Sequence, residues 1–160
     1  MSAANTNVNS SIIPQEFVRG WPVISAAVMG IGLGMSPLPF YTIGVFIGPI
    51  SEEFGWEPSK VLLALSVYTV FIVFMAPFIG IVTDRIGARK VALSSIIMFG
   101  ISMMMQSLHT GSLTIYIALW AFIAIFGAGT LPITFTKAIN NRFDIHRGKA
   151  LGIALVSTGV

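Results

Sequence analysis

The longest stretch without formal charge constrains the fold of this chain more than any other feature. Residues 91–136, 46 positions, contain no Asp, Glu, Lys or Arg. As a single helix this stretch would be about 70 Å long, more than twice the roughly 30 Å of a bilayer core. The polar residues His109-Thr110-Gly111-Ser112 interrupt it. We therefore expect a turn there, between two membrane-spanning helices at about 91–108 and 113–136.

Composition also places the chain in a membrane. Charged residues make up 9% of it, against about 25% in a soluble domain, and hydrophobic residues make up 55%. Residues 20–51 and 61–83 likewise lack formal charge. As one helix the first of these would extend roughly 45 Å, which exceeds a bilayer core. Pro37 and Pro39 favour a break in it, because proline lacks a backbone N–H and kinks a helix interior.

The predicted fold is an all-α integral membrane bundle with four full spans and a truncated fifth. We expect the spans at about 21–50, 61–82, 91–108 and 113–136. A fifth apolar run, 148–160, has about half of the roughly 20 residues that a span needs. The bundle is expected to cover residues 20–160. We expect the C-terminal remainder of a longer protein to be absent from this chain. Residues 1–19 begin with small polar side chains and are expected to form a disordered cytoplasmic tail.

The distribution of Lys and Arg predicts the orientation. Eight basic residues lie on one side of the predicted spans: Arg19, Arg85, Arg89, Lys90, Lys137, Arg142, Arg147 and Lys149. The opposite loops have only Lys60. By the positive-inside rule the N-terminus is cytoplasmic. The same distribution explains the pI of about 9.6 without a nucleic-acid partner, since no basic face with interleaved aromatic residues is present.

A compact cluster of charge joins the second and third predicted spans. The segment 80–90 reads GIVTDRIGARK, and four of the chain's fifteen charged residues (nine basic and six acidic) fall within 84–90. Gly80 permits close approach of a neighbouring helix, and Gly87 can adopt the positive φ that a short turn needs. Asp84 is expected to pair with a basic residue of the segment, Arg85, Arg89 or Lys90, or to face a helix N-terminus.

This segment resembles the conserved loop motif between transmembrane helices 2 and 3 of the major facilitator superfamily of secondary transporters. The resemblance rests on six positions at the family's spacing: Gly80, Asp84, Arg85, Gly87, Arg89 and Lys90. It implies a conformational latch that ties the two halves of a transporter together in the outward-facing state. It also implies twelve helices in two halves, so the partners of this chain would be the lipid bilayer, a small-molecule substrate and a C-terminal half. Without the resemblance, these basic residues would be interpreted as topology-fixing loop charges.

Other segments suggest a narrower resemblance. Arg147, Gly148, Ala150 and Gly152 resemble the R-G-x-A-x-G start of helix 5 in this superfamily. The segments GWPV, FYTIGVFIGPISEEFGW and GAGTLPIT resemble the bacterial branch related to monocarboxylate and oxalate/formate carriers, which implies a small organic anion as substrate and the bacterial inner (plasma) membrane as location. Two positions that carry a basic residue in relatives carry none here. Many relatives have an arginine in helix 4 shortly before a glycine pair, but the run before Gly127 is WAFIAIF. The lysine of helix 1 in animal monocarboxylate carriers aligns at or near Tyr41.

Hydroxyl groups are the predicted substrate contacts, because the spans contain no formal charge. The candidates are Tyr41, Thr42, Tyr68, Thr130 and Thr134. The alternative is that each threonine bonds its own i−4 carbonyl and that the tyrosines anchor at the interface. If the substrate is an anion, its counter-charge must come from helices outside this chain.

Several other classes of protein lack sequence support. Cysteine is absent, and we expect no metal site and no cofactor. Gly127-Ala128-Gly129 lies in an apolar run without the context of a nucleotide-binding loop. No catalytic triad or carboxylate pair is evident, so an enzyme is not expected. The remaining alternatives to a transporter are a small non-transporting membrane subunit and an inactive truncated fragment.

Overall fold

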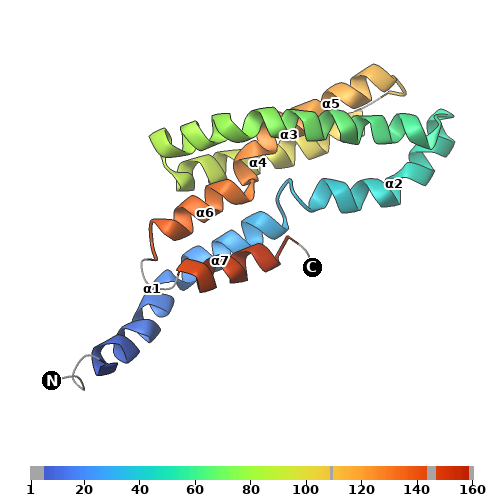
Figure 1. The fold of residues 1–160 in the computed structure, drawn as a ribbon. Helices are drawn as coiled ribbons and strands as arrows, with labels where there is room; N and C mark the ends of the chain where they lie inside the picture. Colours follow the sequence, from blue (N-terminus) through green and yellow to red (C-terminus); the bar gives the residue numbers. More distant parts are fainter. Residues whose placement is uncertain (1–5, 109, 144–146, 159–160) are drawn as a thin grey trace.

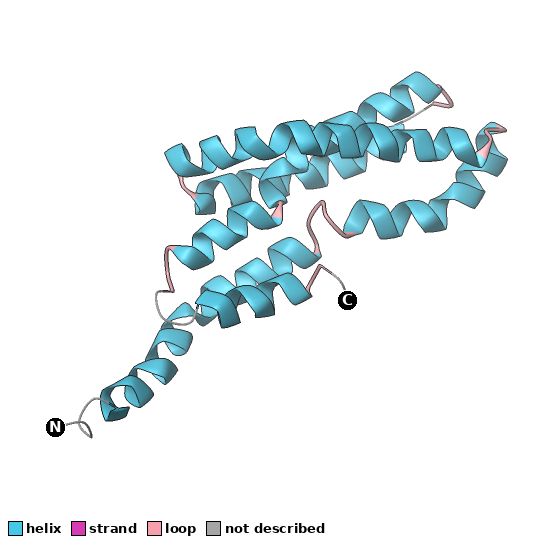
Figure 2. Cartoon of the chain, in the orientation of Figure 1, coloured by secondary structure: helices cyan, strands magenta, loops and turns pink. Residues whose placement is uncertain are grey.

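A computed structural model describes residues 6–108, 110–143 and 147–158, and all regular structure within these ranges is helical. The α-helices are α1 (Thr6–Gly32), α2 (Leu38–Phe54), α3 (Pro58–Ile86), α4 (Ala88–Met105), α5 (Leu113–Gly127), α6 (Pro132–Asn140) and α7 (Arg147–Val156). Two short 3₁₀ helices, η1 (Gln106–Leu108) and η2 (Ala128–Thr130), follow α4 and α5. The all-helical fold predicted from the sequence is confirmed, and its chain path is drawn in Figures 1 and 2.

Three helical segments are long and apolar enough to cross a membrane: Pro58–Ile86, Ala88–Leu108 and Leu113–Asn140. A shorter apolar helix covers Gly20–Gly32. Large apolar side chains face outward along α3, where Val73 is 66% exposed and Phe74 63%. Such exposure suits a helix that is surrounded by lipid rather than water.

The first charge-free run is divided into α1 and α2. Helix α1 ends at Gly32, and residues 33–37 form turns. Helix α2 then begins with a proline in its first turn. A proline in a helix interior leaves the carbonyl four residues earlier without its N–H partner. Pro37 and Pro39 therefore remove the helical partners of the Leu33 and Met35 carbonyls, and α1 does not continue into α2. The predicted disordered tail differs from the structure, in which α1 already begins at Thr6.

The fourth predicted span is also interrupted, which the sequence analysis did not anticipate. α5 ends at Gly127, η2 occupies the next three residues, and α6 begins with Pro132 after Leu131 in an extended conformation. In both interrupted helices, the break contains glycines that are followed by a proline. Neither glycine nor proline favours a continuous helix in this position.

The link between α3 and α4 is a single residue. Gly87 has φ +94°, a conformation that glycine adopts without strain. Because α3 continues to Ile86, Gly80, Asp84 and Arg85 lie on this helix, and Arg89 and Lys90 begin α4.

Two apolar clusters form the core. One joins α2, α3, α5 and the middle of α4, and includes Met35, Tyr68 and Trp120. The other joins α1, α6 and α7 with the start of α4, and includes Ile31, Phe135 and Ala150. Figure 1 shows the same division: α3, α4 and α5 lie side by side, and α1, α6 and α7 pack together toward the N-terminus.

Candidate functional site

The charged motif at residues 80–90 contacts the end of the fourth span. Lys137 Nζ on α6 lies 2.7 Å from Asp84 Oδ1 on α3, and it also donates a hydrogen bond of 2.9 Å to the Gly80 carbonyl oxygen. A Cβ at Gly80 would have Lys137 Nζ as its nearest neighbour, at 3.9 Å, which is an ordinary contact. The lysine head group therefore lies directly beside the motif glycine.

The partner of Asp84 differs from those expected within the motif. Arg85, Arg89 and Lys90 are exposed, whereas the carboxylate pairs with Lys137, a residue that the sequence analysis used only for topology. The Asp84 side chain is 68% exposed and that of Lys137 30%. An ion pair this exposed contributes about 0–1 kcal/mol to stability, so its role is to join two helices rather than to hold the fold.

A second polar cluster lies where the two interrupted helices meet. Thr130 Oγ1 accepts a hydrogen bond of 3.0 Å from the Met35 N–H and donates one of 2.8 Å to the Gly127 carbonyl. The Tyr68 hydroxyl donates to the Met35 carbonyl oxygen. Met35, Tyr68 and Thr130 are at most 1% exposed. The structure thus brings two predicted substrate contacts together, with their hydroxyls bonded to the backbone.

The other predicted contacts are dispersed. Tyr41 is 62% exposed on α2. Thr134 is fully buried on α6, and its hydroxyl has no hydrogen-bond partner among the described residues. Thr42 donates to the Leu38 carbonyl four residues earlier, which is the local bond considered as the alternative reading.

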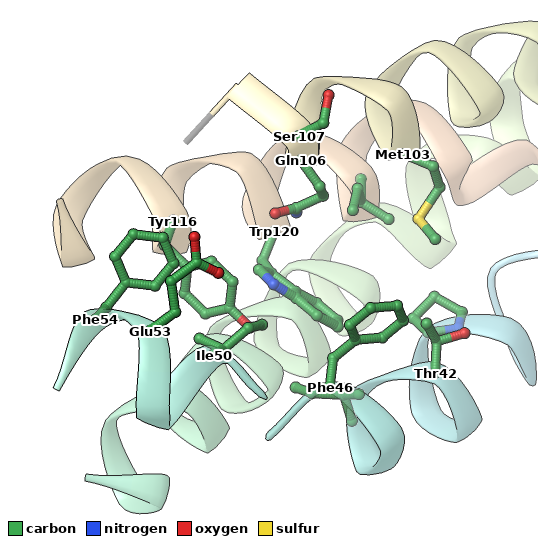
Figure 3. A pocket seen from close by; sticks show the side chains of 13 residues that line it. Thr42, Phe46, Ile50, Glu53, Phe54, Met103, Gln106, Ser107, Tyr116 and Trp120 are labelled. Atoms are coloured by element: carbon green, nitrogen blue, oxygen red, sulfur yellow. The ribbon is translucent and has the colours of Figure 1, made fainter. Parts of the chain in front are cut away.

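A cavity of about 500 Å³ lies between α2, the end of α4 with η1, and α5 (Figure 3). Thr42 is the predicted candidate that lines it, together with Pro39, Ile43, Phe46, Ile50, Glu53, Phe54, Met103, Gln106, Ser107, Tyr116, Trp120 and Ile123. Gln106 Nε2 is buried without a hydrogen-bond partner in the described structure. The sequence analysis missed this donor, because a lone amide in an apolar helix carries no motif.

Acidic and imidazole side chains do not gather into a possible metal site within the described ranges. In α2 to α7 the charged residues lie in the first or last turns of the helices, and the interiors of these helices offer hydroxyl, indole and amide groups. The arrangement is that of a helical bundle with an ion-pair tie at one end and a largely apolar cavity toward the other.

Comparison with known proteins decides the family. The sequence profile of the family described as "Major Facilitator Superfamily" matches residues 23–160, from within α1 to the last residue. This chain belongs to the major facilitator superfamily. It is therefore an integral membrane protein of a transporter family and not an enzyme.

Two curated relatives are similar to this superfamily member. The uncharacterized MFS-type transporter YfiU of Bacillus subtilis is 23% identical over 151 residues, which are 94% of this chain and 28% of the relative. The inner membrane transport protein YnfM of Escherichia coli is 26% identical over 112 residues, 68% of this chain and 27% of the relative. The chain thus spans less than a third of the length of these relatives. No solved structure matches it significantly.

Proposed function

We propose that this chain is the N-terminal portion of a secondary active transporter that works by alternating access, with its solute site shared with a C-terminal half. The observation that carries the proposal is the Asp84–Lys137 ion pair, which joins α3 to α6 at the motif that resembles the superfamily's latch. Alternating access requires contacts that form in one state and release in the other. An exposed ion pair between two helices meets this requirement, because water can solvate both charges when it opens.

The six motif residues act together in this proposal. Gly80 admits the lysine head group, Asp84 supplies the opposite charge, and Gly87 makes the one-residue turn that places α4 beside α3. Arg85, Arg89 and Lys90 are exposed at the same end. In the proposed cycle they face the C-terminal half, where basic groups can meet carboxylates or helix C-termini.

For the solute we propose a small organic anion such as a monocarboxylate. Support comes from the sequence segments similar to the monocarboxylate and oxalate/formate branch. Thr42 lines a cavity that also holds the unpaired Gln106 side-chain N–H group, and such a donor suits carboxylate oxygens. Tyr41, Tyr68, Thr130 and Thr134 remain the other candidates. The balancing positive charge would come from helices outside this chain, since the residues that line the cavity include no Lys or Arg.

The latch is tested by uptake of radiolabelled lactate, formate and oxalate into cells that express the protein. We expect Asp84→Asn to lower uptake by up to about fivefold while membrane insertion is unchanged, because a neutral amide cannot hold Lys137 by charge and an exposed pair is worth about 0–1 kcal/mol. The exchange Asp84→Lys with Lys137→Asp should restore part of the uptake. Glu57→Gln, an exposed carboxylate at the other end of α3, is the matched control and should transport normally.

Two results would count against the proposal in different ways. Normal uptake by the Asp84→Asn variant would remove the latch. Absence of uptake of all three anions by the unmodified protein, with membrane insertion intact, would remove the organic-anion assignment.

A further inference from the structure

The break of the first span exposes two backbone groups of one residue. In a continuous helix the Met35 carbonyl would accept from the N–H of residue 39, but that residue is proline and has none. The Met35 N–H is also outside the helical pattern, because the Ile31 carbonyl accepts from Gly34 instead. Both groups are buried, where an unpaired backbone group is costly. The chain therefore needs partners for Met35 from other helices.

Tyr68 and Thr130 supply these partners. The Tyr68 hydroxyl, on the unbroken helix α3, donates to the Met35 carbonyl, and Thr130 Oγ1, at the break of the fourth span, accepts from the Met35 N–H. The two breaks are thereby joined at one point. Close packing supports the join, since a Cβ at Gly34 would lie 3.1 Å from the Thr130 carbonyl oxygen and one at Gly127 would lie 3.3 Å from Met35 Cβ.

The core divides at the same level. Along the first span, Ile31 belongs to the cluster with α6 and α7, and Met35 belongs to the cluster with α3 and α5. Along the fourth span, Leu131 belongs to the cluster with α3 and α5, and Phe135 belongs to the cluster with α6 and α7. The boundary between the two clusters therefore crosses both helices at their breaks, where the backbone lacks helical continuity.

We propose that Tyr68 and Thr130 are positioning residues that clasp Met35, and that α1, α6 and α7 swing as one unit about this clasp. The Asp84–Lys137 pair then fixes the far end of the unit to α3. This inference rests on the proposed alternating access and adds where the movement is centred. It also assigns the two hydroxyls to the backbone rather than to the solute.

Distances between spin labels test the clasp without any solute. These 160 residues contain no cysteine, so label pairs within them need no substitution of a native cysteine in this part of the protein. One pair, Ile86→Cys with Asn141→Cys, spans the cytoplasmic ends of α3 and α6; the second, Lys60→Cys with Thr114→Cys, spans the opposite ends of α3 and α5, and all four positions are exposed. The labelled full-length protein is placed in vesicles of phosphatidylethanolamine and phosphatidylglycerol, and distance distributions are recorded.

The test variant combines Tyr68→Phe with Thr130→Val, and the matched control combines Tyr41→Phe with Thr134→Val. In the test variant we expect the population of longer distances for the cytoplasmic pair to rise at least about tenfold, because loss of one buried hydrogen bond produces about that change and the variant removes two. The opposite pair, and both pairs in the control, should keep their distributions. Thr130→Ser, which retains the hydroxyl, should behave as the unmodified protein does.

Two outcomes would overturn the inference. An unchanged cytoplasmic pair would show that the clasp does not restrain the unit. Equal broadening of both pairs would show a general loss of packing. If the double variant does not insert, Thr130→Val alone decides between these outcomes. None of these readings depends on uptake, so the inference can fail while the proposed transport stands.

Discussion

At the scale of residues, hydroxyl groups of the same kind have different surroundings. Thr130 and Thr134 lie four residues apart on either side of the break of the fourth span, and both are almost fully buried. The first has two backbone partners, whereas the second has none in the described structure. A buried hydroxyl with partners stabilises the fold, whereas a buried hydroxyl without partners loses its hydration and destabilises the fold. Position in the sequence alone does not separate these two threonines.

We therefore expect opposite effects from two isosteric substitutions. Thr130→Val should lower the free energy of unfolding by about 1–3 kcal/mol, because it leaves the Met35 N–H unpaired. Thr134→Val should be neutral or slightly stabilising. Thermal unfolding of the purified protein in detergent measures both. Equal destabilisation by the two substitutions would mean that side-chain volume, and not the hydrogen bond, decides stability here.

At the scale of elements, glycine sets how closely α4 approaches the break of the fourth span. A Cβ at Gly129 would lie 2.1 Å from Ser95 Oγ and 2.9 Å from Val91 Cγ1, so no side chain fits there. Gly100 lies on the same helix α4 as Ser95, and a Cβ added to it meets nothing within 4 Å. One glycine is thus required by packing, and the other faces open space.

This contrast predicts the results of two alanine substitutions. Gly129→Ala should destabilise the protein by about 1–3 kcal/mol, because overpacking forces α4 and η2 apart. Gly100→Ala should be neutral or stabilising by about 0.5–1 kcal/mol, since alanine favours a helix over glycine. Denaturant titration in mixed micelles compares the two. A stable Gly129→Ala variant would contradict the tight contact between α4 and η2.

The sequence predicts the elements better than it predicts their partners. Charge-free runs and the polar turn at 109–112 locate the spans, and the motif is evident from its spacing. The break after Gly127 was missed because an apolar run that contains glycine and one proline still has the composition of a continuous membrane helix. Asp84 and Lys137 each are the first charged residue at the end of a charge-free run. That shared depth could have indicated their pairing, but which helices lie side by side depends on packing over the whole bundle.

At the scale of the whole molecule, orientation remains a prediction from charge. Eight of the nine basic residues lie at the end of the bundle that holds the motif or in segments predicted on the same side. That end should face the cytoplasm, where positive loops are retained during insertion. The family and the inner-membrane relative agree with a membrane location, and they leave the orientation to experiment.

Single cysteines test the orientation directly. In intact cells a membrane-impermeant maleimide should label Thr114→Cys and should not label Asn141→Cys, and both should react after permeabilisation. The two positions are exposed and lie at opposite ends of the spans. Labelling of Asn141→Cys in intact cells would place the N-terminus outside.

The exposure of the Asp84–Lys137 pair has a consequence for speed. If the two charges were buried, separating them would cost several kcal/mol, and each kcal/mol would slow the step about fivefold. With the carboxylate 68% exposed, separation of the pair is close to the energy of thermal motion. In the proposed transport cycle, opening an ion pair this weak would not limit the rate. The turnover frequency would then depend on the slower rearrangement of the packed helices.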